Sequence, residues 1–214
     1  MKHLECIINS GIFSEINKAE YLYAFEQLKI TEREYRKNET IFLEGDLIET
    51  ICIIERGSVR GEKNYPNGEV HIVSVFEEGN MFGVEITASR TRVAAIDFVS
   101  NEDTLVVFVN MRSVDKGKYS SRIRKALSFH MADENVRMTH KIEILAERGL
   151  RERIKVYLRI LQSKAGADTV TVKMNREQMA QFLCVNRSAL SNELNKMKRE
   201  GLIDFKGSNF KILK

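Results

Sequence analysis

The sequence predicts an α+β protein that consists of a small N-terminal β-barrel or β-roll, a long helix and a C-terminal helical module. Three observations support this prediction. Short apolar runs separated by glycines fill the region from Arg33 to about Met111, residues 119–147 contain neither proline nor glycine, and the last forty residues read as two short helices followed by a hairpin. The chain has 214 residues, 43% of them apolar, which is enough for one to two domains with their own cores.

The strand region is marked by β-branched residues and regularly spaced glycines. Gly45, Gly57, Gly68 and Gly79 recur at intervals of 12, 11 and 11 residues, where each glycine opens or closes an apolar run. The sequence YPNGE at 65–69 is typical of a hairpin turn. Several short strands at regular intervals favour a barrel or roll.

Helical spacing of apolar residues precedes and follows these strands. Residues 14–30 predict a helix with Ser14 as its N-cap. Residues 119–147 predict one long helix, which carries an apolar stripe on one side interrupted by Glu134 and Lys141. Such a stripe is more often part of an intramolecular core than a dimer seam, and both interpretations stay open at this point. The residues of the stripe are Leu127, Met131, Met138, Ile142 and Leu145.

The C-terminal residues carry the strongest functional pattern. Two short amphipathic helices meet at 183–186, and a hairpin with a turn at 206–209 follows them. The second helix has one apolar face, predicted to be buried, formed by Ala189, Leu190, Leu194 and Met197. Its other face is polar, as is required of a helix that reads base edges in the major groove of DNA. The polar residues are Arg187, Ser188, Ser191 and Asn192.

The charge distribution agrees with binding to nucleic acid. Residues 148–214 contain 15 Lys/Arg and 6 Asp/Glu, whereas residues 1–147 contain 19 and 24, which together give the net charge of +4. A cationic C-terminal part is the expected electrostatic footprint of phosphate contacts. A solvated basic face is the alternative explanation, but the adjoining helix-turn-helix pattern makes phosphate contact the better one.

The sequence contains no pattern of an enzyme or a metal site. The three cysteines, Cys6, Cys52 and Cys184, are far apart and lack CxxC spacing, so we expect neither disulfides nor a structural metal. We find no phosphate-cradling glycine loop, no metal-spaced His/Glu pair and no nucleophile elbow, so we expect no catalytic residues. No apolar run reaches the length of a membrane span and the N-terminus is unlike a signal sequence, which predicts a cytoplasmic protein without membrane association.

Four segments together resemble the Crp/Fnr family of bacterial regulators: FLEGD at 42–46, IIERGSV at 53–59, the NGE hairpin and EEGNMFG at 77–83, followed by the helix-turn-helix. The resemblance covers nearly the whole chain. It implies a double-stranded β-helix (β-roll) effector domain of the cyclic-nucleotide-binding type over 1–118, a long dimerisation helix over 119–147 and a winged helix-turn-helix over 148–214. The resemblance also favours the interpretation of the apolar stripe as the seam of a homodimer.

The resemblance further implies which residues contact double-stranded DNA. Arg187 matches a family arginine, and Asn192 stands where relatives often have arginine, so we expect adenine to replace guanine in that part of the half-site. Cys184 occupies a position that is commonly glycine in the family. The full set of expected DNA contacts is Arg176, Asn186, Arg187, Ser188, Ser191, Asn192, Lys206 and Ser208.

A dimer of this kind reads a palindromic operator, because two recognition helices on a two-fold axis reach major grooves about 34 Å apart. Gly149, just after the long helix, is the expected hinge. RNA polymerase is a further expected partner if the protein activates transcription, which one sequence does not decide.

The effector is not identified by the sequence. After Phe82-Gly83 the glutamate that holds the ribose in nucleotide-binding relatives is displaced to Glu85, and the position of the phosphate-binding arginine falls near Ala94 rather than on Arg92. Cyclic AMP is therefore disfavoured, since a buried phosphate without a cation costs several kcal/mol. Three cysteines exclude a four-cysteine iron-sulfur cluster, and the four histidines have no haem context. The expected effector pocket consists of Phe82, Gly83, Val84, Glu85, Arg92, Phe98 and Met131.

Three functions stay open from the sequence. The first is a homodimeric DNA-binding regulator controlled by a small effector or a redox signal. The second is a cyclic-nucleotide-responsive regulator of the same architecture, and the third is a β-roll scaffold or enzyme that does not bind DNA.

Overall fold

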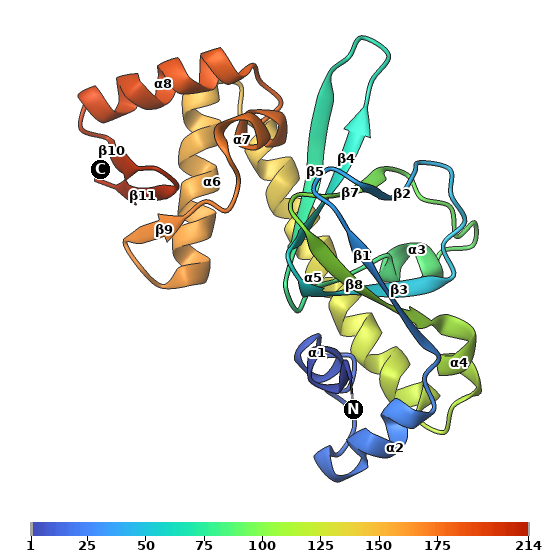
Figure 1. Ribbon diagram of the computed structural model, residues 1–214. Coiled ribbons are helices and arrows are strands. Elements are labelled where there is room, and N and C mark those ends of the chain that lie inside the picture. Colours follow the sequence, from blue (N-terminus) through green and yellow to red (C-terminus); the bar gives the residue numbers. More distant parts are fainter. Residues whose placement is uncertain (1, 214) are drawn as a thin grey trace. The chain divides into compact units, whose positions relative to one another are not determined.

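The computed structural model describes residues 2–213, which form two compact units that meet between residues 134 and 135 of the chain (Figure 1). The helices of the first unit are α1 (Leu4–Asn9), a 3-10 helix (Lys18–Glu20), α2 (Tyr21–Glu26), α3 (Val84–Ala88) and α4 (Met111–Lys116). Its strands are β1 (Ile30–Tyr35), β2 (Thr40–Phe42), β3 (Thr50–Arg56), β4 (Ser58–Asn64), β5 (Val70–Glu77), β6 (Met81–Phe82), β7 (Asp97–Ser100) and β8 (Thr104–Asn110).

The long helix α5 (Ser120–Ala146) contains the boundary between the two units. The second unit continues with α6 (Leu150–Ala165), β9 (Thr169–Thr171), α7 (Arg176–Phe182), α8 (Arg187–Arg199), β10 (Ile203–Lys206) and β11 (Asn209–Ile212). Within residues 2–213, no helix combines the length and the apolar character that a membrane crossing requires.

The strands of the first unit form the predicted β-roll. They pair antiparallel in two four-stranded sheets, of order β1-β8-β3-β6 and β2-β7-β4-β5. The hairpin predicted at 65–69 joins β4 to β5, with the Tyr65 amide donating to the Glu69 carbonyl at 2.9 Å. Gly57, between β3 and β4, has φ +90°, and a Cβ there would lie 2.6 Å from Thr104 Oγ1. This turn therefore requires glycine.

Strand β3 separates two cores because its side chains alternate between the two faces of its sheet. Ile51 and Ile53 belong to what we call the outer core, which α1, α2, α4 and α5 cover with residues such as Ile7, Ala24, Val114 and Leu127. Cys52 and Ile54 belong to the inner core, which lies between the two sheets and contains Val59, Phe76, Phe82, Phe98 and Val106. All four of these β3 residues are fully buried.

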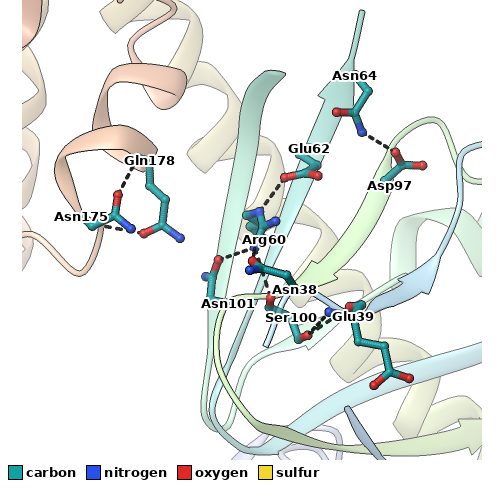
Figure 2. Close-up of polar contacts among 10 residues, drawn as sticks. All are labelled: Asn38, Glu39, Arg60, Glu62, Asn64, Asp97, Ser100, Asn101, Asn175 and Gln178. Carbon is teal, nitrogen blue, oxygen red and sulfur yellow. Dashed lines mark hydrogen bonds and ion pairs between the residues drawn. The ribbon is translucent and has the colours of Figure 1, made fainter. Parts of the chain in front are cut away.

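A polar network fastens the outer side of the sheet β2-β7-β4-β5 (Figure 2). Arg60 Nε donates to Glu62 at 2.5 Å, and its Nη1 donates to the Ser100 carbonyl and to Asn101 Oδ1, both at 3.1 Å. Arg60 and Glu62 are both nearly buried, at 13% and 11% side-chain exposure. The charges are paired and hydrogen-bonded, as burial of an ion pair requires.

Two local predictions were wrong. The single helix over 14–30 is replaced by the 3-10 helix and α2, since the Asn17 side chain, not Ser14, caps the start by accepting from the Ala19 amide at 3.0 Å. Residues 84–88 form α3 rather than an extended strand, with Gly83 in a left-handed conformation (φ +79°) before it. On an extended strand, a displacement by one residue would turn the Glu85 side chain to the opposite face of the sheet, but Glu85 is instead exposed on this short helix.

The second unit is a winged helix-turn-helix, as predicted. Helix α6 buries Ile154, Tyr157 and Leu158, and the three-stranded sheet has the order β10-β11-β9. Strands β10 and β11 form the C-terminal hairpin, which we call the wing. Helices α7 and α8 precede the wing in the sequence.

Candidate nucleic-acid interface

The turn between α7 and α8 is a Schellman motif, which is defined by two backbone hydrogen bonds at a helix C-terminus. The Val185 amide donates to the Ala180 carbonyl at 3.0 Å, and the Cys184 amide donates to the Gln181 carbonyl at 3.3 Å. Cys184 occupies the left-handed position with φ +55°. This is the position that glycine fills with least strain, so the side chain of Cys184 is accepted at a conformational cost.

Replacing Cys184 with glycine should therefore stabilise the second unit. Relief of the left-handed strain is worth about 1–2 kcal/mol, and the greater freedom of glycine in the unfolded chain offsets about 0.5–1 kcal/mol of it. We expect a gain of up to about 1 kcal/mol in the free energy of unfolding, measured from the denaturant midpoint of the second unit. Cys184→Ala keeps the Cβ and is the control, which should show no such gain. A Cys184→Gly variant less stable than the alanine variant would contradict the strain argument.

Helix α7 begins with a reciprocal capping box (Figure 2). Asn175 Oδ1 accepts from the Gln178 amide at 2.9 Å, and Gln178 Oε1 accepts from the Asn175 amide at 3.0 Å. The next residue, Arg176, was expected to contact DNA. Within the unit, its guanidinium donates to the Gly207 carbonyl at 2.9 Å and lies over the rings of Phe205 and Phe210.

Arg176 therefore holds the wing against α7. Burial lowers the pKa of its guanidinium, which nevertheless keeps its charge, as arginine does throughout proteins. The positive charge of Arg176 still attracts a nearby phosphate electrostatically. However, at least one of its N–H donors is already hydrogen-bonded within the unit, to the Gly207 carbonyl.

Helix α8 has the two faces that the sequence predicts, with one correction. Leu190, Leu194 and Met197 are buried. Ala189 is exposed, because it precedes Leu190 by one residue and so lies outside the stripe formed by these three residues. Ser191 is half-buried, at the border of the two faces. The remaining polar residues at the start of the helix are exposed: Asn186, Arg187, Ser188 and Asn192.

Ion pairs fix α8 to α6 on the side away from its first turn. Arg151 Nε donates to Glu193 at 2.6 Å, and both of its terminal nitrogens bind Glu200, at 2.6 and 3.2 Å. The hydrogen bond from Arg151 lowers the pKa of the Glu200 carboxyl. A bidentate arginine pair restricts orientation as well as distance. These ion pairs thus fix the orientation of α8 relative to α6.

The C-terminal end of α7 is held by two cations, which we call the carbonyl clamp. Lys141 of α5 donates to the Phe182 carbonyl, and its ammonium lies 3.2 Å from the centroid of the Phe182 ring. Arg153 of α6 donates to the Leu183 carbonyl at 3.0 Å and to the Glu147 carbonyl at 2.9 Å. These donors satisfy carbonyls that a helix end leaves unpaired.

Burial lowers the pKa of Lys141 to about 7. The charge interaction with Cys184 acts in the opposite direction and raises this pKa. Neither Lys141 nor Arg153 was predicted as a site residue. The sequence did indicate that Lys141 is unusual, because a lysine within an apolar stripe needs a polar partner. The sequence alone does not identify that partner.

The wing presents the two residues expected to contact DNA. Lys206 and Ser208 are both exposed at the turn between β10 and β11. The Ser208 carbonyl accepts from the Val172 amide at 2.8 Å, which ties the turn to the strand β9 region. Lys198 of α8 donates to the Phe205 carbonyl at 3.1 Å and pairs with Asp204 at 2.6 Å. The wing is thus anchored to both helices of the motif.

The residues expected to form one effector pocket lie in two different places. Phe82 and Phe98 are fully buried in the inner core, where their rings stack at 5.1 Å. Val84 belongs to the outer core and Met131 packs against it. With Arg92, these two residues line a cavity of about 150 Å³ in the first unit. The prediction of a single pocket enclosed by Phe82, Val84, Phe98 and Met131 was therefore wrong, because a sheet separates the two pairs.

The cysteines do not gather. Cys6 and Cys52 are buried and Cys184 is partly exposed, all three as free thiols. Burial raises the pKa of the Cys6 thiol to about 12, and it raises that of Cys52 as well. Among residues 2–213, no group of three or more His, Cys, Asp or Glu side chains is arranged to hold a metal ion.

The predicted stripe of α5 divides into two parts. Leu127 is only 4% exposed, so it belongs to the intramolecular core and the prediction that it pairs with a partner helix was wrong; Met131 packs on the same core but is only partly buried. Met138 and Leu145 are half-buried, whereas Ile142 is 69% exposed. Two further apolar residues of α5, Phe129 and Val136, are exposed at 52% and 55%. They are seven residues apart and were not predicted.

Gly149 forms the N-cap of α6 in extended backbone, with φ −106° and ψ 141°. Any residue adopts this conformation, and a Cβ there would meet nothing within 4 Å. The structure therefore gives no conformational reason for glycine at the position predicted as a hinge.

Both units resemble known domains. Residues 32–116 match the cyclic nucleotide-binding domain, and residues 152–214 match the Crp-like helix-turn-helix domain. The chain is 23% identical over 209 residues to the nitrogen fixation regulation protein FixK of Bradyrhizobium diazoefficiens, covering 93% of this chain and 84% of that protein. It is 22% identical to the CRP-like cAMP-activated global transcriptional regulator of Mycobacterium tuberculosis, covering 97% and 94% of the two chains.

Solved structures share the fold at similar identity. FixK2 from Bradyrhizobium japonicum superposes with a TM-score of 0.72 at 22% identity, covering 87% of this chain and 94% of that one. The c-di-GMP-responsive global regulator CLP of Xanthomonas campestris also gives 0.72, at 17% identity, with coverage of 92% and 100%. With a cyclic-nucleotide-binding-type β-roll followed by a Crp-like helix-turn-helix, this chain belongs to the Crp/Fnr family of DNA-binding transcription regulators.

Proposed function

We propose that Arg187, Ser188, Ser191 and Asn192 read the base edges of a palindromic operator. The observation that carries this proposal is the exposed polar residues Arg187, Ser188 and Asn192 at the start of α8, a helix whose other face is buried and whose far end is fixed by Arg151. A recognition helix needs both properties, since base contacts specify a sequence only when the helix that makes them cannot rotate.

Asn186, Lys206 and Ser208 act as backbone contacts in this proposal. Asn186 is exposed at the N-cap of α8 and its side chain makes no capping hydrogen bond. Its amide is thus available to a phosphate at the positive end of the helix. Arg176 acts mainly by positioning the wing, through its bond to Gly207.

The protein acts as a homodimer through α5. Phe129 and Val136 are apolar, exposed and one heptad apart, as a parallel pair of helices requires. Ile142 adds apolar surface near the C-terminal end of the helix. Pairing of two copies along this face supports the two-fold symmetry of the operator.

The effector is a small molecule other than a cyclic nucleotide. Phe76, Phe82 and Phe98 fill the inner core, with ring centroids 5.1–6.2 Å apart, which leaves little room for a nucleotide between the sheets. A cyclic-nucleotide-responsive regulator is the second candidate, favoured by the domain match over 32–116. Calorimetry with cyclic AMP and cyclic GMP separates the two: saturable heat at micromolar ligand would establish the second candidate.

Operator selection from random DNA tests the reading residues. We expect a palindrome with adenine opposite Asn192, because a carboxamide pairs bidentately with adenine. We also expect the affinity for the selected site to fall steeply with salt as counterions are released. An invariant guanine contacted by Asn192, or binding without sequence preference, would contradict the assignment. If the protein activates transcription from such sites, RNA polymerase is a further partner in this proposal, and a protein that acts on chromosomal DNA works in the cytoplasm.

A further inference from the structure

A cavity of about 150 Å³ lies in the first unit beside α3, α4 and α5. Its apolar wall is formed by Val84 and Ala88 of α3, Met111 of α4, and Leu127 and Met131 of α5. A cavity of about this volume accommodates one benzene-sized group when its walls are apolar. The space therefore suits a compact apolar body rather than a nucleotide.

This cavity is separate from the interior of the roll. Val84 and Leu127 belong to the outer core, on the face of the sheet that carries Ile51 and Ile53. The ring cluster of Phe82 and Phe98 belongs to the inner core, on the other face. A ligand in the cavity would thus contact α3 and α5 without entering the space between the two sheets.

The polar side of the cavity is cationic. Arg92 and Arg112 both bind the single carboxylate of Glu49, with N–O distances of 3.5 and 2.8 Å. Each guanidinium has five N–H donors, so one shared carboxylate uses only a small part of their capacity. The third arginine of the lining, Arg124, pairs with Asp115. The lining thus has three arginines against two acids, an excess of one positive charge.

Arg92 is held at this place by unusual backbone. Its φ of +53° lies in the left-handed region, which residues with a Cβ seldom adopt. The conformation is fixed by hydrogen bonds on both sides: the Arg92 amide donates to Ser89 Oγ at 2.9 Å, and its carbonyl accepts from the Ile48 amide at 2.8 Å. Strain kept in a well-bonded loop is characteristic of functional positions, and here it directs a cation to the cavity lining.

We infer that this cavity binds a small monocarboxylate with a compact apolar body, of the size of benzoate. The ring occupies the space between Val84, Leu127 and Met131. The carboxylate binds Arg92 and Arg112, so that the ligand and Glu49 share these two guanidinium groups. Planar guanidinium groups suit a carboxylate because two parallel N–H donors match its two oxygens. This inference goes beyond the DNA-reading assignment and does not depend on it.

Methionine methyl NMR on the full chain without DNA tests the inference directly. Met111 and Met131 line the cavity and report on its occupation, whereas Met174 and Met197 lie buried in the second unit and serve as internal references. On titration with benzoate we expect saturable shifts of Met111 and Met131 only. Benzyl alcohol, which has the ring without the charge, should bind about tenfold more weakly, since the charge-assisted hydrogen bonds are lost.

Matched variants complete the experiment. Arg92→Gln should weaken benzoate binding about tenfold. Arg90→Gln, at an exposed arginine two positions away and outside the lining, should leave binding unchanged. Ala88→Leu should abolish the shifts by filling the cavity from an exposed helical position. Absence of shifts at millimolar benzoate, equal affinity for benzyl alcohol, or unchanged affinity in Arg92→Gln would overturn the inference.

Discussion

Replacing Arg187 with alanine is expected to weaken binding to the selected operator by about tenfold to a hundredfold, the effect of losing one bidentate contact to a base or phosphate. Arg187 is exposed on the first turn of α8, so its loss should leave the fold and thermal stability unchanged. Fluorescence anisotropy with labelled operator at several salt concentrations measures the effect. Arg159→Ala is the matched control, because it removes one exposed positive charge from α6 of the same unit.

The salt dependence also decides what Arg187 contacts. If it clamps a phosphate, the slope of log affinity against log salt should become less steep by about 0.9, and all sequences should be weakened alike. If it pairs with guanine, the slope should stay nearly constant and discrimination at one base pair should be lost. Equal operator affinity of Arg187→Ala and the unmodified protein would remove α8 as the reading element.

Replacing Val136 with glutamate is expected to separate the dimer into monomers. In a symmetric pair of helices the change occurs twice, so two carboxylates would approach each other across an apolar contact. Like charges placed together cost several kcal/mol, which should raise the dimer dissociation constant more than about a hundredfold. Light scattering coupled to size exclusion measures the mass, and operator affinity should fall with it because one half-site binds alone.

Two controls separate dimer loss from damage to the fold. Val136→Ile keeps the apolar contact and should remain dimeric. Tyr23→Glu introduces the same charge at a residue that is 66% exposed outside α5, and it should also remain dimeric. A dimeric Val136→Glu variant with normal operator affinity would exclude this face of α5 as the seam.

Long-range architecture could be predicted from the sequence, but several local elements could not. The periodicities that define the strands, the long helix and the reading motif extend over many residues. Helices α1 and α3 have six and five residues, too few to show a helical period. Gly83, in a left-handed conformation, stands between Phe82, the last residue of β6, and Val84, the first residue of α3.

The sequence predicted the site residues that are simply exposed on a helix. It did not predict the residues whose role depends on a tertiary contact with another part of the chain. Arg187 and Asn192 follow from helical spacing alone, and both are exposed as expected. Arg176 has the same residue type, but its place between Gly207 and Phe210 depends on how the wing folds back. Leu127 has the spacing of a seam residue, yet it packs on strands some twenty residues and more before it in the chain. The spacing of residues predicts which face of a helix a side chain lies on. Only the tertiary structure shows which residues that face contacts.

The carbonyl clamp has a consequence for how an effector signal reaches DNA. Lys141 precedes Gly149 and Arg153 follows it, and both bind carbonyls at the end of α7, while Arg153 also binds Glu147. A bend at Gly149 would disturb the two bonds that span it, from Lys141 to Phe182 and from Arg153 to Glu147. We therefore expect the last residues of α5 to move together with the end of α7, so that any change of direction in response to an effector would occur before Lys141.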